Sequence, residues 1–211
     1  MAKETNQLNE EEKEALKFLE RDFNQSYQQM RHYDQQIFEI FKFLFTAYTA
    51  LVGVSVGLFQ FGLKEGIDLR LAGVSAIAVA IVLGLFLLGV AVRNRIYFVQ
   101  VTRYINEQRR LFVVYKPLGF QNCSGMYTDP KLPPYFDWRS SQSWITYTVA
   151  TLNSILFGVF LYLYLPSNPY RKFYIIISGS ILLVIQLFVC IRYLMTREKK
   201  NADGAVFGRK C

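Results

Sequence analysis

The chain has 211 residues, of which 52% are hydrophobic and 19% charged, and its formal net charge is +8 at pH 7. Its three cysteines lack metal-binding or redox spacing. Its one histidine, His32, excludes a histidine-based metal site and makes a Ser/His or Cys/His hydrolase implausible. We therefore expect no enzyme, no catalytic residue, no metal and no cofactor, and we interpret all three cysteines as free thiols.

Residues 1–42 form the first predicted element, a polar segment that contains an amphipathic helix. Its seam positions repeat at alternating intervals of three and four residues, which is the spacing of a heptad. From the first seam position onward neither proline nor glycine interrupts the segment, so the helix is predicted to continue into the hydrophobic residues that follow. The seam residues are Leu16, Leu19, Phe23, Ser26, Met30, Tyr33, Ile37 and Ile40.

Residues 43–92 are predicted to form a transmembrane hairpin with spans at 43–63 and 71–92. Each span lacks charged residues over about 20 positions, the length of helix that crosses about 30 Å of hydrocarbon. Backbone groups in lipid must be satisfied within the segment, which requires a helix. The connecting loop, KEGIDLR, is short, so the two helices are expected to be antiparallel neighbours.

Residues 93–142 are predicted to be a cytosolic helix followed by a proline-rich and aromatic loop. The helix carries a second heptad seam, which we expect to pack against the seam of the first helix as a long cytosolic hairpin. We expect the loop to be ordered, because its aromatic side chains can bury area, and its SSQS sequence offers an N-cap for the next helix. The second seam consists of Tyr97, Val101, Tyr104, Gln108, Leu111 and Tyr115.

Three arginines of this segment, Arg103, Arg109 and Arg110, form the candidate cytosolic partner face. They lie roughly 15–25 Å beyond the end of the second span, at about 1.5 Å per helical residue, so lipid head groups do not account for them. A solvated helix surface is the plainer interpretation, and a soluble protein partner is the functional one. RNA binding through arginine and tyrosine is a weaker alternative, because the sequence has no nucleic-acid motif.

Residues 143–191 are predicted to form a second transmembrane hairpin, with spans at 143–165 and 173–191, followed by a basic tail at 192–211. Of the 24 lysines and arginines, 20 lie before residue 43, between 93 and 139, or after 191. The positive-inside rule therefore places both termini and the central segment in the cytosol. The predicted fold class is an all-α integral membrane protein with four transmembrane helices, in the plasma (inner) membrane.

Small residues recur at every fourth position in three of the four spans. Such stripes let helices approach closely in lipid and predict a tightly packed bundle, within one chain or between chains of a homo-oligomer. The candidate packing residues are Gly53, Gly57, Ala72, Ala76, Ala80, Gly84, Ala150, Ser154 and Gly158.

Three amide side chains, Asn153, Gln186 and Gln60, are the strongest polar groups inside the predicted spans. The plainer expectation is one interhelical hydrogen bond between Asn153 and Gln186. The alternative is a ring of Asn153 side chains around a pore in an oligomer, in which case leucine at this position would abolish conduction.

The order of elements over residues 10–113, an amphipathic helix, a two-span hairpin and a cytosolic return, resembles small membrane effectors of bacterial defence systems. These include SLATT-type effector domains and the membrane accessory proteins of RNA-targeting CRISPR loci. The resemblance implies an oligomer that perturbs the membrane when a partner triggers it, and it assigns no site residue.

The expected function is therefore an oligomeric membrane effector or channel-like protein, whose cytosolic hairpin senses a soluble partner and whose spans perturb or gate the lipid bilayer. The alternative is a non-conducting anchor that recruits a soluble partner to the membrane. The two differ in whether the protein depolarises cells.

Overall fold

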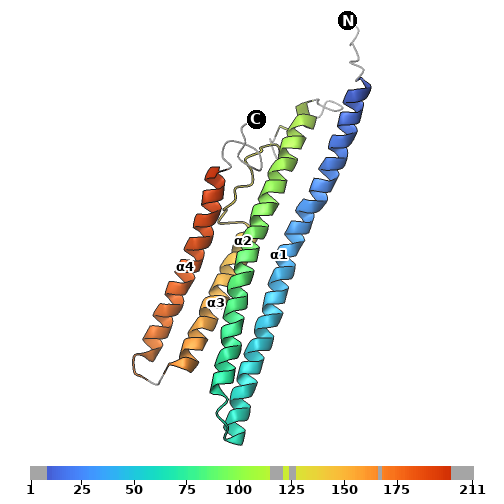
Figure 1. Ribbon diagram of the computed structural model, residues 1–211. Helices are drawn as coiled ribbons and strands as arrows, with labels where there is room; N and C mark the ends of the chain where they lie inside the picture. The colour runs from blue at the N-terminus through green and yellow to red at the C-terminus, as the bar shows by residue number, and fades with distance from the viewer. Residues whose placement is uncertain (1–8, 115–120, 124–126, 166–167, 201–211) are drawn as a thin grey trace. The chain divides into compact units, whose positions relative to one another are not determined.

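The computed structural model describes residues 9–114, 121–123, 127–165 and 168–200. These residues form four α-helices and no strand: α1 (Glu10–Glu65), α2 (Arg70–Val114), α3 (Ser141–Tyr164) and α4 (Arg171–Lys200) (Figure 1). The all-α prediction is confirmed for the described residues. Each predicted span lies within one helix, except that the last residue of the third, Leu165, is the C-cap of α3.

The helices begin and end where local side chains satisfy their free backbone groups. Asn9 and Glu12 bond to each other's backbone N–H groups at 2.7 and 2.9 Å, which forms a capping box at the start of α1. Gly66 takes a positive φ of 69° after α1, and the Ile67 N–H donates to the Gly62 carbonyl, as in a Schellman motif. Ser140 caps α3 by accepting from the Ser143 N–H, as the SSQS sequence predicted.

The chain divides into two compact units. The described residues of unit 1 fall within 9–34, 97–114, 121–123 and 127–134, and those of unit 2 within 35–96, 135–165 and 168–200. Helices α1 and α2 each contribute one part to each unit without a break, because neither helix contains a proline.

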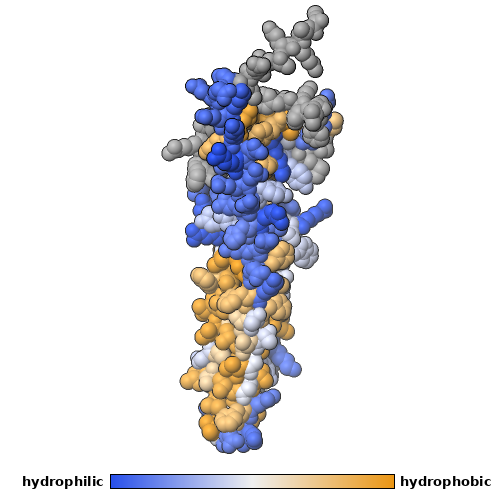
Figure 2. Space-filling model, turned by 90° about the vertical axis from the view of Figure 1, so that its right-hand side faces the viewer, coloured by the Kyte–Doolittle hydropathy of each residue, from blue (hydrophilic) through white to orange (hydrophobic). Residues whose placement is uncertain are grey.

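Unit 2 contains the hydrophobic part of all four helices, and each is long and apolar enough to cross a membrane. Large apolar side chains on these helices are exposed, for example Val82 and Phe86, at 68% and 67%. Figure 2 shows hydrophobic side chains covering much of this unit's surface on the face in view. A contiguous apolar surface of this kind suits lipid contact rather than water, so length and composition indicate a multi-pass membrane protein.

In unit 1 the polar parts of α1 and α2 lie side by side and run antiparallel. Tyr33 stacks on Tyr97 with ring centroids 5.7 Å apart, and Phe23 packs edge-on against Phe112 at 6.5 Å. Every predicted seam position of α1 is buried or half-buried.

The predicted seam of α2 is less well buried: Gln108 is buried and Val101 half-buried, whereas Tyr97, Tyr104 and Leu111 are exposed. Tyr115 lies outside the described residues. At the far end the seam shifts by one residue, because Phe112 rather than Leu111 faces Phe23. A straight helix has 3.6 residues per turn and drifts by about 20° per heptad, which accounts for the shift.

Candidate functional site

The centre of unit 2 holds a buried amide pair. Asn153 on α3 is fully buried, and its Nδ2 donates to Gln186 Oε1 on α4 over 2.9 Å. This is the interhelical hydrogen bond that the sequence suggested. An amide is costly in hydrocarbon unless it is paired, so the bond fixes these two helices to each other at this level.

Helices α1 and α2 close the site from the other side. The Tyr48 hydroxyl on α1 donates to Asn153 Oδ1, and Tyr48 itself is only 7% exposed. Gly84 on α2 faces both groups, and a Cβ on this glycine would overlap the Tyr48 hydroxyl and the Asn153 oxygen. All four helices therefore meet at one hydrogen-bonded point. We call Tyr48, Gly84, Asn153 and Gln186, together with Ser154, the amide cluster.

The remaining donor of the amide cluster is also occupied. Gln186 Nε2 lies 3.2 Å from Ser154 Oγ, 3.3 Å from the Leu182 carbonyl and 3.5 Å from the Ala150 carbonyl. The Ser154 hydroxyl in turn donates to the Ala150 carbonyl over 2.9 Å. These contacts are hydrogen bonds between neutral groups, and they hold the helices together at this level.

The alternative prediction, a ring of Asn153 around a pore, does not fit this placement. The side chain is 0% exposed within a single chain, and its carbonyl oxygen and amide nitrogen both have partners in that chain. A pore-lining side chain would have to face away from its own bundle. Gln60, the third predicted polar group, is exposed on α1.

The small-residue stripes differ in how they are used. Ala80, Gly84, Ala150 and Ser154 are buried where the four helices meet. Ala76 and Gly158 are half-buried and Ala72 is exposed. For Gly53 and Gly57, no described atom beyond the local helix lies within 4 Å of an added Cβ, so their stripe makes no close contact within the described chain.

A second polar cluster of unit 2 joins α2 to the segment before α3 and to α4. Arg95 is 7% exposed; its Nε donates to the Tyr135 carbonyl at 3.0 Å, and its Nη1 donates to Gln142 Oε1 at 3.3 Å. The Tyr135 N–H donates to Glu198 Oε2 on α4 at 2.8 Å. This arginine therefore binds one backbone carbonyl and one side-chain amide of its own chain.

In unit 1, polar side chains of α2 hold the proline-rich loop. Arg103 Nε donates to the Pro133 carbonyl at 3.0 Å, and Asn106 Nδ2 donates to the carbonyls of Leu132 and Asp129 at 2.8 and 3.1 Å. Arg103 is only 9% exposed. Its prediction as part of an exposed partner face is therefore wrong. Buried loop carbonyls need hydrogen-bond donors, and the Arg103 guanidinium supplies one.

The other two arginines of the predicted face remain accessible to different degrees. Arg110 is exposed, whereas Arg109 is half-buried with its guanidinium 5.6 Å from the Phe23 ring and 5.2 Å from the Tyr127 ring. A pocket of about 370 Å³ opens beside these three side chains, with Asn122 in its wall. The accessible part of the predicted face is thus Arg110 and the Arg109 pocket.

The facing seams of unit 1 contain a carboxylate that the heptad pattern missed. Asp22 accepts from the Tyr104 hydroxyl and from Gln108 Nε2, the latter at 2.6 Å. The hydrogen bond to Asp22 is the main cause of a raised pKa for Tyr104, followed by desolvation. Asp22 directly precedes the seam residue Phe23, so its place at the edge of the seam was visible in the spacing, but its partners were not.

The described residues contain no group of three or more His, Cys, Asp or Glu that could hold a metal ion. Cys123 is exposed and Cys190 buried, both as free thiols, while Cys211 lies outside the described residues. Four apolar helices joined by a buried amide cluster define a helical protein with the composition of a multi-pass membrane protein.

Comparison with known proteins finds no protein-family model, no curated protein and no solved structure that matches this chain.

Proposed function

We propose that this protein is a multi-pass membrane effector, in which a signal received by a cytosolic helical hairpin changes the packing of four transmembrane helices. The polar halves of α1 and α2 form the hairpin and the four apolar segments form the spans. The basic residues clustered before, between and after the two span pairs support a cytosolic position for both termini and the hairpin.

The observation that carries the proposal is the continuity of α1 and α2. Helix α1 is a single helix of 56 residues, with Asp22 in its polar half and Tyr48 of the amide cluster in its apolar half. Helix α2 is a single helix of 45 residues; its polar half contacts Asp22, and its apolar half contains Gly84. An unbroken helix transmits rotation or displacement along its axis, because a sharp bend strains its backbone hydrogen bonds.

The amide cluster is the part of the spans whose packing would change in this proposal. Interhelical hydrogen bonds in membrane proteins average only about 0.6 kcal/mol in double-mutant cycles, so exchange of partners within the cluster is expected at modest cost. Rotation of α1 would withdraw the Tyr48 hydroxyl from Asn153 and leave polar groups exposed along the helices. Oligomerisation through the uncovered Gly53 and Gly57 face would then let the spans perturb or gate the bilayer. This is the behaviour implied by the resemblance to bacterial defence effectors.

A second candidate function is a non-conducting anchor that recruits a soluble protein through Arg110 and the Arg109 pocket. One observation favours it: the amide cluster is closed within one chain, with partners for its donors and its acceptors. An anchor needs only this static packing.

Depolarisation of cells tests the proposal against the alternative. The Phe23→Glu variant places a charge against Phe112 in the seam, whereas Phe18→Glu places the same charge on the same helix at a position that is 67% exposed. With matched membrane levels, we expect the parent and Phe18→Glu to depolarise cells alike, reported by a voltage-sensitive dye, and Phe23→Glu to differ from both. Silence of all three would favour the anchor.

A further inference from the structure

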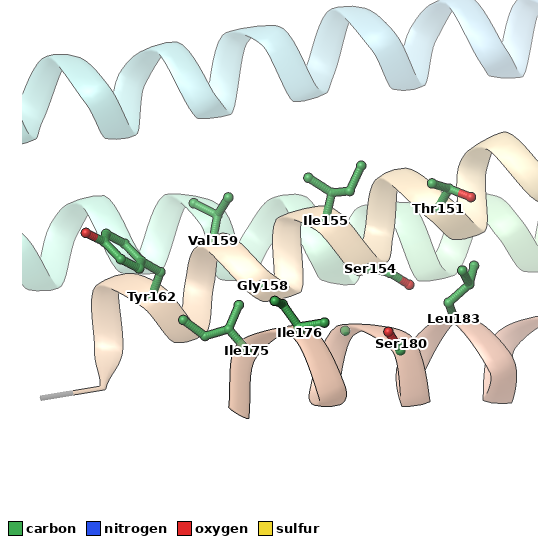
Figure 3. A pocket seen from close by; sticks show the side chains of 11 residues that line it. Thr151, Ser154, Ile155, Gly158, Val159, Tyr162, Ile175, Ile176, Ser180 and Leu183 are labelled. Atoms are coloured by element: carbon green, nitrogen blue, oxygen red, sulfur yellow. The ribbon is translucent and has the colours of Figure 1, made fainter. Parts of the chain in front are cut away.

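An open groove runs between α3 and α4 on the surface of unit 2. It has a volume of about 490 Å³ and a wall that is mostly apolar, formed by Ile155 and Val159 on one side and by Ile176 and Leu183 on the other (Figure 3). In a helix bundle that crosses a membrane, this groove faces the hydrocarbon.

Small residues make the groove by allowing the two helices to approach closely beneath it. A Cβ on Gly179 would lie 3.3 Å from the Ser154 carbonyl, and one on Gly158 would lie 3.4 Å from Ile175 Cγ2. Both glycines line the groove. Their missing side chains leave a channel in the surface that ordinary apolar residues would fill.

One end of the groove carries a cation. Tyr162 lines this end, and the Arg171 guanidinium lies 3.9 Å from the centre of its ring and donates to its carbonyl. No described carboxylate forms an ion pair with Arg171, so its charge is not neutralised within the described residues. Arg171 is also the first residue of α4, where the helix dipole adds positive potential.

We propose that this groove is a phospholipid site, in which one acyl chain lies between α3 and α4 and the phosphate binds Arg171. The cation sits where α4 begins, which is where the head groups of one leaflet would lie. The eleven residue steps from Thr151 to Tyr162 span about 16 Å of helix. That is about half of the roughly 30 Å of hydrocarbon, or one leaflet.

Length and charge together favour lipid over a helix of a second copy. A packed transmembrane helix would use a groove that continues through both leaflets, and it would place no anion beside Arg171. A guanidinium that no carboxylate neutralises is suited to phosphate oxygens, since it offers several donors in one plane.

Lipid binding to the purified full-length chain tests the site. Native mass spectrometry in mild detergent would compare dioleoylphosphatidylglycerol with dioleoylglycerol, which has the same chains and no phosphate. We expect one tightly bound phosphatidylglycerol per chain and weak binding of dioleoylglycerol. Arg171→Gln should weaken phosphatidylglycerol binding by about tenfold, as expected for one charge-assisted hydrogen bond. The matched control, Lys172→Gln at the exposed neighbouring residue, should leave binding unchanged.

Two further variants separate the groove from the bundle. Ser180→Leu fills the rim of the groove at an exposed position, and Gly89→Leu adds the same side chain to an exposed part of α2, where an added Cβ meets no described atom within 4 Å. We expect only Ser180→Leu to displace the bound lipid while both remain folded. Equal lipid retention in Ser180→Leu and the parent would overturn the proposal. The proposal would also be overturned if Ser180→Leu abolished a crosslinked dimer of the parent and displaced no lipid, because a second copy of the chain would then occupy the groove.

Discussion

Replacement of Gly84 by alanine tests whether four helices meet at the amide cluster. An added Cβ would overlap the Tyr48 hydroxyl and the Asn153 carbonyl oxygen and would lie 2.8 Å from Tyr48 Cζ. Ordinary carbon contacts are at about 3.5–4.0 Å, so the tyrosine ring must move by roughly 0.7 Å or more. That movement takes the hydroxyl away from its acceptor.

The expected cost follows from three contributions. Overpacking a close-packed site costs about 1–3 kcal/mol, and the lost interhelical hydrogen bond adds about 0.6 kcal/mol. Alanine returns about 0.5–1 kcal/mol because it restricts the unfolded chain more than glycine does. We therefore expect Gly84→Ala to lower the free energy of unfolding by about 1–3 kcal/mol, which lowers the melting temperature by on the order of 5 °C.

Reaction of the buried Cys190 thiol with a coumarin maleimide reports unfolding of the bundle. The exposed Cys123 and the terminal Cys211 are replaced by serine, so that Cys190, at 8% exposure, is the single thiol. The temperature at which the dye reacts is then measured for purified protein in mild detergent.

Gly89 provides the matched control, because it lies on the same helix and an added Cβ there meets no described atom within 4 Å. Gly89→Ala should melt at or slightly above the parent temperature. Adding Tyr48→Phe to Gly84→Ala removes the closest overlapping atom and should restore part of the loss. Equal melting temperatures for Gly84→Ala and Gly89→Ala would refute the packing described for the amide cluster.

Three further predictions concern topology, the hairpin and the loop. Reporter fusions at the C-terminus and beside Gly66 should report opposite sides of the membrane, because three predicted spans separate them; a shared side would exclude the four-span topology. Cysteines at Met30 and Val101 should form a disulfide in membranes, because the Tyr33 and Tyr97 rings stack one turn away. Arg103→Leu should increase deuterium uptake in the proline-rich loop, whereas the same change at the exposed Arg110 should not; equal uptake would mean that the guanidinium does not hold the loop.

The helices were predictable because their signals are local. Absence of charge over about 20 residues is visible in the sequence and defines a span. Ser140 and Gly66 mark helix ends by rules that need only neighbouring residues. The Asn153–Gln186 pair was predictable for a related reason: an amide in a span needs a partner, and the spans offered few.

The remaining contacts depend on which face of each helix turns inward, and an apolar helix in lipid gives little sign of that. Tyr48 is one aromatic residue among many in its span, so its bond to Asn153 was missed. Arg103 was taken for a surface residue because arginine usually is one. Its burial depends on the Pro133 carbonyl, which a loop of irregular backbone brings to it.

Labelling of Cys190 in the intact membrane tests most directly whether the hairpin controls the spans. The single-thiol protein is placed in lipid vesicles, and the rate of reaction with a membrane-permeant maleimide is compared for the parent, Phe23→Glu and Phe18→Glu. This rate reports the packing of the spans whether or not ions pass. Coupling through α1 and α2 predicts a several-fold change in rate for Phe23→Glu and none for Phe18→Glu. Identical rates in all three, with the Phe23→Glu hairpin shown by crosslinking to be open, would contradict the account.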